Sequence, residues 1–419
     1  MKISTCLIVK NEAENIGRCL DSIKNISDEI IVVDTGSTDD TVEIAKSFGA
    51  RVYFYGWDNN FSNAKNFALE KATGDWIIFL DADEYFGENT QKNLISVLKR
   101  VYGKKEFDAI LCKMINVEGV NGKVISENPI MRIFRGNSGI RYTGAVHEYP
   151  VKNGKPLNAA IINDLSLIIY HTGYSSAILT DKIQRNLDIL KKQIENNITD
   201  DKTYYYMSSM NKSLGNYEET VKYALLALAE PEMKNTIVAY QPYVFLIQSM
   251  LNLKDKYSVD ETEKYAEEAI SKYPDHPEIW YVAAKVKMAR NNYDEAIKCY
   301  LKALDCQKGF NMLMNNSFPS RLEEVYFDLA ALYGYVDDNI RSLECYYEVL
   351  KINKRNISAL EGLYNLIKDQ QPAEIILFLN SIYDKNSRED LAFLVHAMNR
   401  FNNSLIANYY YKLYESLQS

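Results

Sequence analysis

Residues 29–48, EIIVVDTGSTDDTVEIAKSF, decide the fold. The first six, Glu29–Asp34, form an apolar run ending in an acid, which is typical of a buried parallel strand. A glycine turn follows, and residues 40–48 have the apolar spacing of a short helix. A strand, a turn and a helix in that order predict one unit of an α/β fold.

The same alternation extends on both sides of this stretch. Strands are predicted at residues 3–9, 51–55 and 76–80, and helices at 14–26 and 63–72. The resulting β-α-β-α-β-α-β order predicts a mostly parallel, Rossmann-like sheet with helices on its faces. Ligands of such sheets bind beyond the carboxyl ends of the strands.

The composition changes near residue 175. Fourteen of the 18 glycines lie in residues 1–175, whereas 24 of the 32 tyrosines lie after them. The segments 261–270 and 295–304 share a pattern that repeats after 34 residues and resembles tetratricopeptide repeats, which stack into a solenoid. A plain helical bundle is the alternative. We predict an α/β domain at 1–175, a connecting helix at 176–200 and an all-α, tetratricopeptide-like repeat domain at 201–419.

Several classes of protein are excluded by composition. The net charge of −8 lacks the Lys/Arg excess that general nucleic-acid binding requires. No run of 18 uncharged apolar residues occurs, so no membrane span is expected, and the N-terminal apolar run is too short for a signal peptide. Six scattered cysteines indicate reduced thiols. A cytoplasmic protein is expected.

Acidic residues follow two of the predicted strands. Asp34 ends one strand, and Asp81-Ala82-Asp83-Glu84 follows the strand at 76–80. Close carboxylates repel, which raises a pKa unless a cation neutralises them, and Mg²⁺ or Mn²⁺ bridging to a diphosphate would do so. A solvated acidic turn is the alternative for 81–84. Helix capping explains Ser37 and Asp39 but leaves Asp34 unexplained.

Three segments together resemble the family 2 glycosyltransferases of GT-A fold. They are ISTCLIVKNEAENIGRCLDSI from residue 3, EIIVVDTGSTDDTVEIA from residue 29 and WDNNFSNAKNFALEKATGDWIIFLDADE from residue 57. The resemblance implies sugar transfer from a nucleotide diphosphate donor, with inversion at the anomeric carbon. It also implies that Asp34 faces the donor's base, and that Asp81 and Asp83 hold the metal and the diphosphate. The residues expected to border the nucleotide are Lys10, Asn11 and Glu12.

One motif departs from the family pattern. Residues 60–66 resemble F-[SA]-x-A-R-N, but Lys65 stands where arginine is usual. A lysine offers phosphate a point charge without the bidentate fork of arginine. Lys65 is therefore a candidate contact of the donor diphosphate, and an exposed lysine on the helix surface is the alternative.

Further motifs resemble the family 2 enzymes that carry tetratricopeptide repeats, including the peptide S-glycosyltransferases of glycocin bacteriocins. They are R-I-F-R at 132–135, V-H-E at 146–148, H-T-G-Y at 171–174 and K-I-Q-R-N at 182–186. An inverting transfer needs a base near the acceptor, for which Glu148 is the first candidate and His147 the second. Which of Arg132 and Arg135 reaches the pocket stays open.

Three further side chains are candidates for the donor site. His171 is expected to complete the metal sphere beside Asp83, and a buried histidine bonded to a backbone carbonyl is the alternative. Lys182 and Arg185 share one helix face and are expected to close over the diphosphate. A solvated helix face is the alternative for this pair.

The expected function is a metal-dependent, inverting transfer of a sugar from a UDP-sugar to a polypeptide side chain, Cys or Ser/Thr. The helical repeats would bind the acceptor or a partner. Two alternatives stay open, namely a lipid-linked or cell-surface glycan acceptor, and a non-catalytic repeat protein that binds nucleotide sugars. A homodimer, which the resembling enzymes imply, is also left open.

Overall fold

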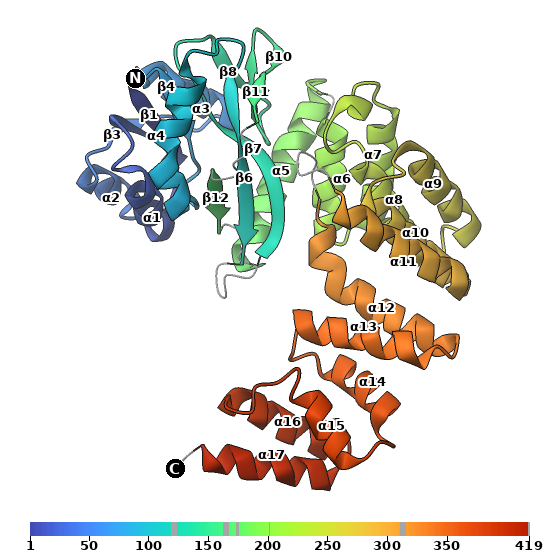
Figure 1. Ribbon diagram of the computed structural model, residues 1–419. Helices are drawn as coiled ribbons and strands as arrows, with labels where there is room; N and C mark the ends of the chain where they lie inside the picture. Colours follow the sequence, from blue (N-terminus) through green and yellow to red (C-terminus); the bar gives the residue numbers. More distant parts are fainter. Residues whose placement is uncertain (119–123, 162–166, 173–175, 201, 311–315, 418–419) are drawn as a thin grey trace. The chain divides into compact units, whose positions relative to one another are not determined.

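The computed structural model describes residues 1–118, 124–161, 167–172, 176–200, 202–310 and 316–417 (Figure 1). The chain divides into two compact units. The first consists of Met1–Leu253 with Asn311–Ser317, and the second of Lys254–Phe310 with Phe318–Ser419.

The first unit opens with the predicted alternation of strands and helices. Strands β1 (Ile3–Val9), β2 (Glu29–Asp34), β3 (Arg51–Phe54) and β4 (Trp76–Phe79) pair in parallel in the order β3-β2-β1-β4. The helices between them are α1 (Ala13–Ile23), α2 (Thr41–Ser47) and α3 (Phe61–Lys71). The α/β prediction is confirmed, and the ends of the elements differ by a few residues.

The rest of the main sheet mixes directions. It continues from β4 in the order β7-β6-β12-β5, with β7 antiparallel to β4 and to β6, and β12 parallel to β6. A short β11 also pairs with β6, and β10-β9-β8 form a separate small sheet. The remaining elements of this part are β5 (Glu84–Phe86), α4 (Glu88–Tyr102), β6 (Ala109–Val117), β7 (Val124–Arg135), β8 (Ile140–Thr143), β9 (Tyr149–Lys152), β10 (Lys155–Pro156), β11 (Ala159–Ala160) and β12 (Ile168–His171).

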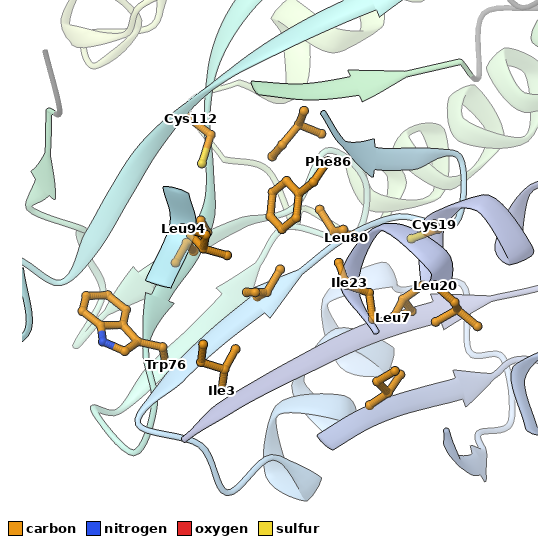
Figure 2. Packing of buried hydrophobic residues seen from close by; sticks show 14 of the residues in the cluster. Ile3, Leu7, Cys19, Leu20, Ile23, Trp76, Leu80, Phe86, Leu94 and Cys112 are labelled. Carbon is orange, nitrogen blue, oxygen red and sulfur yellow. The ribbon is translucent and has the colours of Figure 1, made fainter. Parts of the chain in front are cut away.

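Both faces of the main sheet are covered, which explains its continuously apolar strands. Successive side chains of β1 point to opposite faces, so Leu7 joins one buried cluster and Cys6 the other. Figure 2 shows the first cluster, where Ile23 of α1 lies near Leu80, the residue after β4. This packing fixes the strand ends at which the acidic residues lie.

Four helices of the first unit follow the sheet. They are α5 (Ser176–Glu195), α6 (Thr203–Ser213), α7 (Tyr217–Ala229) and α8 (Gln241–Asn252), with a 3₁₀ turn, η1 (Met233–Asn235), between the last two. Leu187 and Leu190 of α5 and Met207 of α6 form a buried cluster with Val146, which precedes β9. The secondary structure therefore changes near residue 175, whereas the compact unit extends to Leu253.

The second unit is helical in its described residues. The elements are α9 (Val259–Lys272), α10 (Pro277–Ala289), α11 (Tyr293–Lys308), η2 (Phe318–Arg321), α12 (Leu322–Tyr335), α13 (Asn339–Ile352), α14 (Ile357–Ile367), α15 (Pro372–Leu379), α16 (Arg388–Arg400) and α17 (Ser404–Ser416). Three helices, α11, α13 and α17, begin with the same kind of N-cap. Their cap residues are Asn292, Asp338 and Asn403, and the side chain of each accepts a hydrogen bond from the backbone amide three residues later.

Small buried residues let the repeat helices pack closely. Ala269 of α9 and Ala303 of α11, which occupy equivalent positions of the sequence repeat, are both 0% exposed. In the part of the chain that the structure describes, no helix has both the length and the apolar composition needed to cross a membrane.

Glu29 at the start of β2 connects three segments of the first unit. Its carboxylate accepts hydrogen bonds from the Ser4 hydroxyl and from the backbone and hydroxyl of Thr73, and pairs with Lys2 and Arg51. Burial by itself raises the pKa of Glu29, but the hydrogen bonds from Ser4, Thr73 and Lys2 outweigh it and lower the pKa from 4.5 to about 2.

A Glu29→Gln variant is therefore expected to lose pH-dependent stability of about 1–2 kcal/mol at pH 7, because solvent at the half-exposed Lys2 and Arg51 screens part of the effect. Because the folded pKa is depressed, this contribution is complete above pH 4.5 and disappears as the pH falls toward 2. Urea unfolding of both proteins between pH 7 and pH 3 measures the difference. The exposed Glu43→Gln variant is the control, and a gap that stays constant over this range contradicts the expectation.

Candidate active site

A cavity of about 480 Å³ lies beyond the carboxyl ends of β1, β2 and β4. Its walls come from strand ends, from α3 and β7, from the turn before β9, and from α5 and α6. The predicted site residues that line it are Lys10, Glu12, Asp81, Asp83, His147, Glu148, His171, Lys182 and Arg185. The side chains of Lys182 and Arg185 thus line the cavity.

Asp34 and Asn11 shape the loop beside the cavity instead of lining it. The Asp34 carboxylate accepts hydrogen bonds from the backbone amides of Gly36, at 3.0 Å, and Ser37, at 3.1 Å. Asn11, with φ of 55°, accepts one at 2.7 Å from the amide of Thr38. Thr35, next to Asp34, lines the cavity. The contact of Asp34 with a nucleotide base stays a prediction.

Lys65 is almost completely buried beneath the cavity. Its side chain is 1% exposed, so the alternative of an exposed surface lysine is wrong. The Nζ atom lies 3.0 Å from Oδ1 of Asp81 and 2.6 Å from Oε1 of Glu148. The rings of Phe79 and Tyr142 lie 5.0 and 5.2 Å from the same Nζ, within the range of cation–π attraction.

Arg132 is the arginine of β7 that reaches the cavity. It pairs with Oδ2 of Asp81 at 2.5 Å and with Glu84, whose side chain is 1% exposed. Arg135 instead donates to backbone carbonyls near the end of α4, including that of Val101 at 3.0 Å. Burial raises the pKa of Asp81, but Arg132 and Lys65 outweigh burial and hold the pKa well below its usual range.

Asp83 lies beside two other basic side chains that line the cavity. Its Oδ2 lies 3.4 Å from Nε2 of His171 and 3.6 Å from Nζ of Lys182. Burial raises the pKa of Asp83, but the hydrogen bond and charge of His171 lower it overall. For His171, burial lowers the pKa, and Asp83 reverses this and raises it.

The predicted metal ligands do not form a three-ligand site. Among the described residues, no three His, Cys, Asp or Glu side chains come together where they could hold a metal ion. Asp81 is instead neutralised by Lys65 and Arg132. Asp83 and His171 remain as a candidate pair of metal ligands. Nδ1 of His171 lies 2.8 Å from Oδ1 of Asn116, which orients the ring, and its Nε2 points to Asp83.

Asp83 and His171 therefore fit a divalent cation that takes its other ligands from water and a diphosphate. Mg²⁺ sites use one or two carboxylates with substrate phosphates in this way. Gly173 and Tyr174, the last residues of the H-T-G-Y motif, lie outside the described residues.

Aromatic rings and the candidate bases also line the cavity. The ring of His147 stacks on Tyr206 of α6, with centroids 4.0 Å apart, and Trp57 meets Phe61 at 4.7 Å. His147 has an exposed surface, but the protein around its imidazole lowers the pKa by desolvation, so the ring is neutral near pH 7. Glu148, its neighbour, is half-buried and held by Lys65.

Comparison with known families finds one match in each part of the chain. Residues 4–123 match the family described as Glycosyl transferase family 2, and residues 256–310 match a tetratricopeptide repeat family. This chain carries a family 2 glycosyltransferase domain. The second match covers both copies of the 34-residue pattern, so the repeat prediction is confirmed for that segment.

Individual proteins are similar to parts of this chain. The SPbeta prophage-derived glycosyltransferase SunS of Bacillus subtilis is 33% identical over 224 residues, 52% of this chain and 51% of SunS. This chain thus spans about half the length of SunS. A TPR repeat-containing protein of Synechococcus elongatus is 39% identical over 147 residues, 35% of each chain.

A solved glycosyltransferase structure is also similar in sequence. Glucosyl-3-phosphoglycerate synthase from Mycobacterium tuberculosis, in complex with Mn²⁺, uridine diphosphate and glucosyl-3-phosphoglycerate, is 27% identical over 28% of this chain and 45% of that chain. The TM-score of 0.24 is too low for a structural comparison of the two sites.

Proposed function

We propose that this protein transfers a sugar from a UDP-sugar to a Cys or Ser/Thr side chain of a polypeptide, with inversion at the anomeric carbon. The main support is one cavity lined both by Asp83, with its neighbours His171 and Lys182, and by the candidate bases Glu148 and His147. An in-line displacement needs both sets of residues in one cavity, because the base must act on the face opposite the leaving group.

The donor side of the cavity compensates negative charge. Lys182 and Arg185 bring two cations toward a diphosphate at the ends of β1 and β4. Asp83 and His171 would hold Mg²⁺ or Mn²⁺, and a cation there would supply further charge compensation for the departing diphosphate. Arg132 and Lys65 already neutralise Asp81, so that aspartate adds no uncompensated charge.

On the acceptor side, Glu148 receives the proton of the acceptor thiol or hydroxyl. The acceptor sulfur or oxygen forms the new bond to the anomeric carbon while the bond from that carbon to the diphosphate oxygen breaks. The nucleoside diphosphate leaves with the electron pair of the broken bond. His147 is neutral near pH 7 and stands beside Glu148 as the second candidate base.

Two features favour a polypeptide acceptor. The tetratricopeptide repeats belong to a class that binds extended or helical peptides on concave surfaces. The V-H-E and K-I-Q-R-N motifs, which resemble those of peptide S-glycosyltransferases, both line the cavity. A lipid-linked or cell-surface glycan acceptor and a non-catalytic nucleotide-sugar sensor are the outcomes against which the proposal is tested.

The test is mass-spectrometric detection of sugar transfer from UDP-sugars, with Mn²⁺, to panels of peptides and of glycan acceptors. Glu148→Gln is expected to lower peptide transfer about 10²–10⁴-fold, because the amide accepts no proton, while UDP affinity stays unchanged. The exposed Glu70→Gln variant on α3 is the control. Transfer to glycans alone contradicts the polypeptide proposal, and UDP-sugar binding without any transfer contradicts enzymatic activity.

A further inference from the structure

Lys65 of α3 is a buried lysine with an unusual position. It lies next to the catalytic cavity without lining it, and its Nζ contacts two carboxylates from distant parts of the chain. The first is Asp81 after β4, and the second is Glu148 in the turn before β9. An ammonium group has three N–H donors, and two of those of Lys65 are used by these carboxylates.

The surroundings of Lys65 hold it in that position. The rings of Phe79 and Tyr142 lie about the ammonium at 5.0 and 5.2 Å, and both are buried. Burial lowers the pKa of Lys65, but Asp81 and Glu148 outweigh burial and raise the pKa overall. The side chain is therefore a fixed positive charge under the cavity floor, with little freedom to swing out toward a ligand.

A line of alternating charges passes through Lys65. From the acceptor side it reads Glu148, Lys65, Asp81, Arg132 and Glu84, and it joins α3, the end of β4, β7 and the turn before β9. Each inner member pairs with the two beside it. Removing one member leaves its neighbours partly unpaired in a low-dielectric site, which is costly.

We propose that Lys65 is a positioning residue that holds the Glu148 carboxylate toward the acceptor and does not bind the donor diphosphate. This inference rests on the proposed function, in which Glu148 receives the acceptor's proton. Oε1 of Glu148 takes the 2.6 Å ion pair, which assigns the proton to the second oxygen, Oε2. When Lys65 is changed, Asp81 keeps its ion pair with Arg132, whereas Glu148 loses its ion pair with Lys65.

The experiment is a double-mutant cycle in the full chain. It compares Lys65→Met, Lys65→Arg, Glu148→Gln and the double variant Lys65→Met/Glu148→Gln. The readouts are kcat for sugar transfer and the affinity for UDP with Mn²⁺ by calorimetry. Lys71→Met on the same helix is the matched control, because Lys71 lies against the rings of Tyr53 and Phe67 away from the cavity.

We expect Lys65→Met to lower kcat about 10–100-fold, the range for a misplaced catalytic group, and to leave UDP affinity within about twofold. Lys65→Arg restores most of kcat because it keeps the charge. In the Glu148→Gln background, Lys65→Met has no further effect on kcat, since a residue that acts through Glu148 has nothing left to position.

Two results overturn the inference. In the first, Lys65→Met lowers UDP affinity more than about tenfold, and the kcat losses of the two single variants multiply in the double variant. Lys65 would then bind the donor diphosphate independently of Glu148. The other is the absence of coupling between the two substitutions in thermal unfolding, which needs no turnover. If the variants show this thermal coupling and the wild-type chain binds UDP but transfers no sugar, the proposed function is overturned instead.

Discussion

An Asp83→Asn variant is expected to lose sugar transfer by about 10³-fold or more, with little change in thermal stability. The amide keeps the shape of the side chain but removes the negative charge that faces His171 at 3.4 Å and Lys182 at 3.6 Å. A carboxylate is also the oxygen ligand that Mg²⁺ and Mn²⁺ prefer. Losing one charged group that stabilises the departing diphosphate lowers the rate of transfer by about this factor.

The measurement is the rate of transfer at saturating UDP-sugar and Mn²⁺, together with Mn²⁺-dependent UDP binding. Because the pKa of Asp83 is lowered, the wild-type carboxylate is ionised throughout the neutral range, so the comparison is unaffected by small changes of pH. The exposed Asp40→Asn variant serves as the control, since Asp40 lies outside the cavity. Retention of a tenth or more of wild-type transfer would remove Asp83 from the proposed mechanism.

The parallel half of the sheet was predictable because its signals are local. Each strand from β1 to β4 is a short apolar run covered on both faces, and each helix between them has helical spacing in its own residues. The cavity's place at the strand ends follows from the same order of elements. Lys10, Asp81 and Asp83 line it for that reason.

The partners of those residues were not predictable, because they are brought together by pairing between distant segments. His171 meets Asn116 since β12 pairs with β6, with these two residues opposite each other. Arg132 reaches Asp81 because β7 inserts beside β4 in an antiparallel direction. Strand order and register of this kind leave no trace in the spacing of single residues, so Glu84 and Asn116 were missed.

The helical contribution to the cavity was only half predicted. The K-x-x-R-N motif pointed to Lys182 and Arg185, but nothing in the run TYYYM at 203–207 distinguishes Tyr206 from its tyrosine neighbours. Only the structure shows that Tyr206 is the residue whose ring stacks on His147. Trp57 lay within a recognised segment, yet its place in the cavity wall depends on the turn before α3.

The buried cluster between α5, α6 and the turn before β9 predicts that the first 175 residues do not fold stably without these two helices. A chain shortened to residues 1–175 is expected to aggregate and to bind no UDP, whereas a chain ending at Leu253 is expected to unfold cooperatively and to bind UDP with Mn²⁺. The shorter chain exposes Val146 to water and lacks the lining residues Lys182 and Arg185.

Size-exclusion chromatography, thermal unfolding by circular dichroism and UDP calorimetry on both shortened chains test this expectation. The full chain is the reference for UDP affinity, which the chain ending at Leu253 should match within about threefold, since the lining residues of the cavity all precede that point. A soluble chain of residues 1–175 with the UDP affinity of the full protein would show that α5 and α6 are an attachment to the glycosyltransferase domain. Loss of binding in the shorter chain alone would make these two helices a working part of that domain.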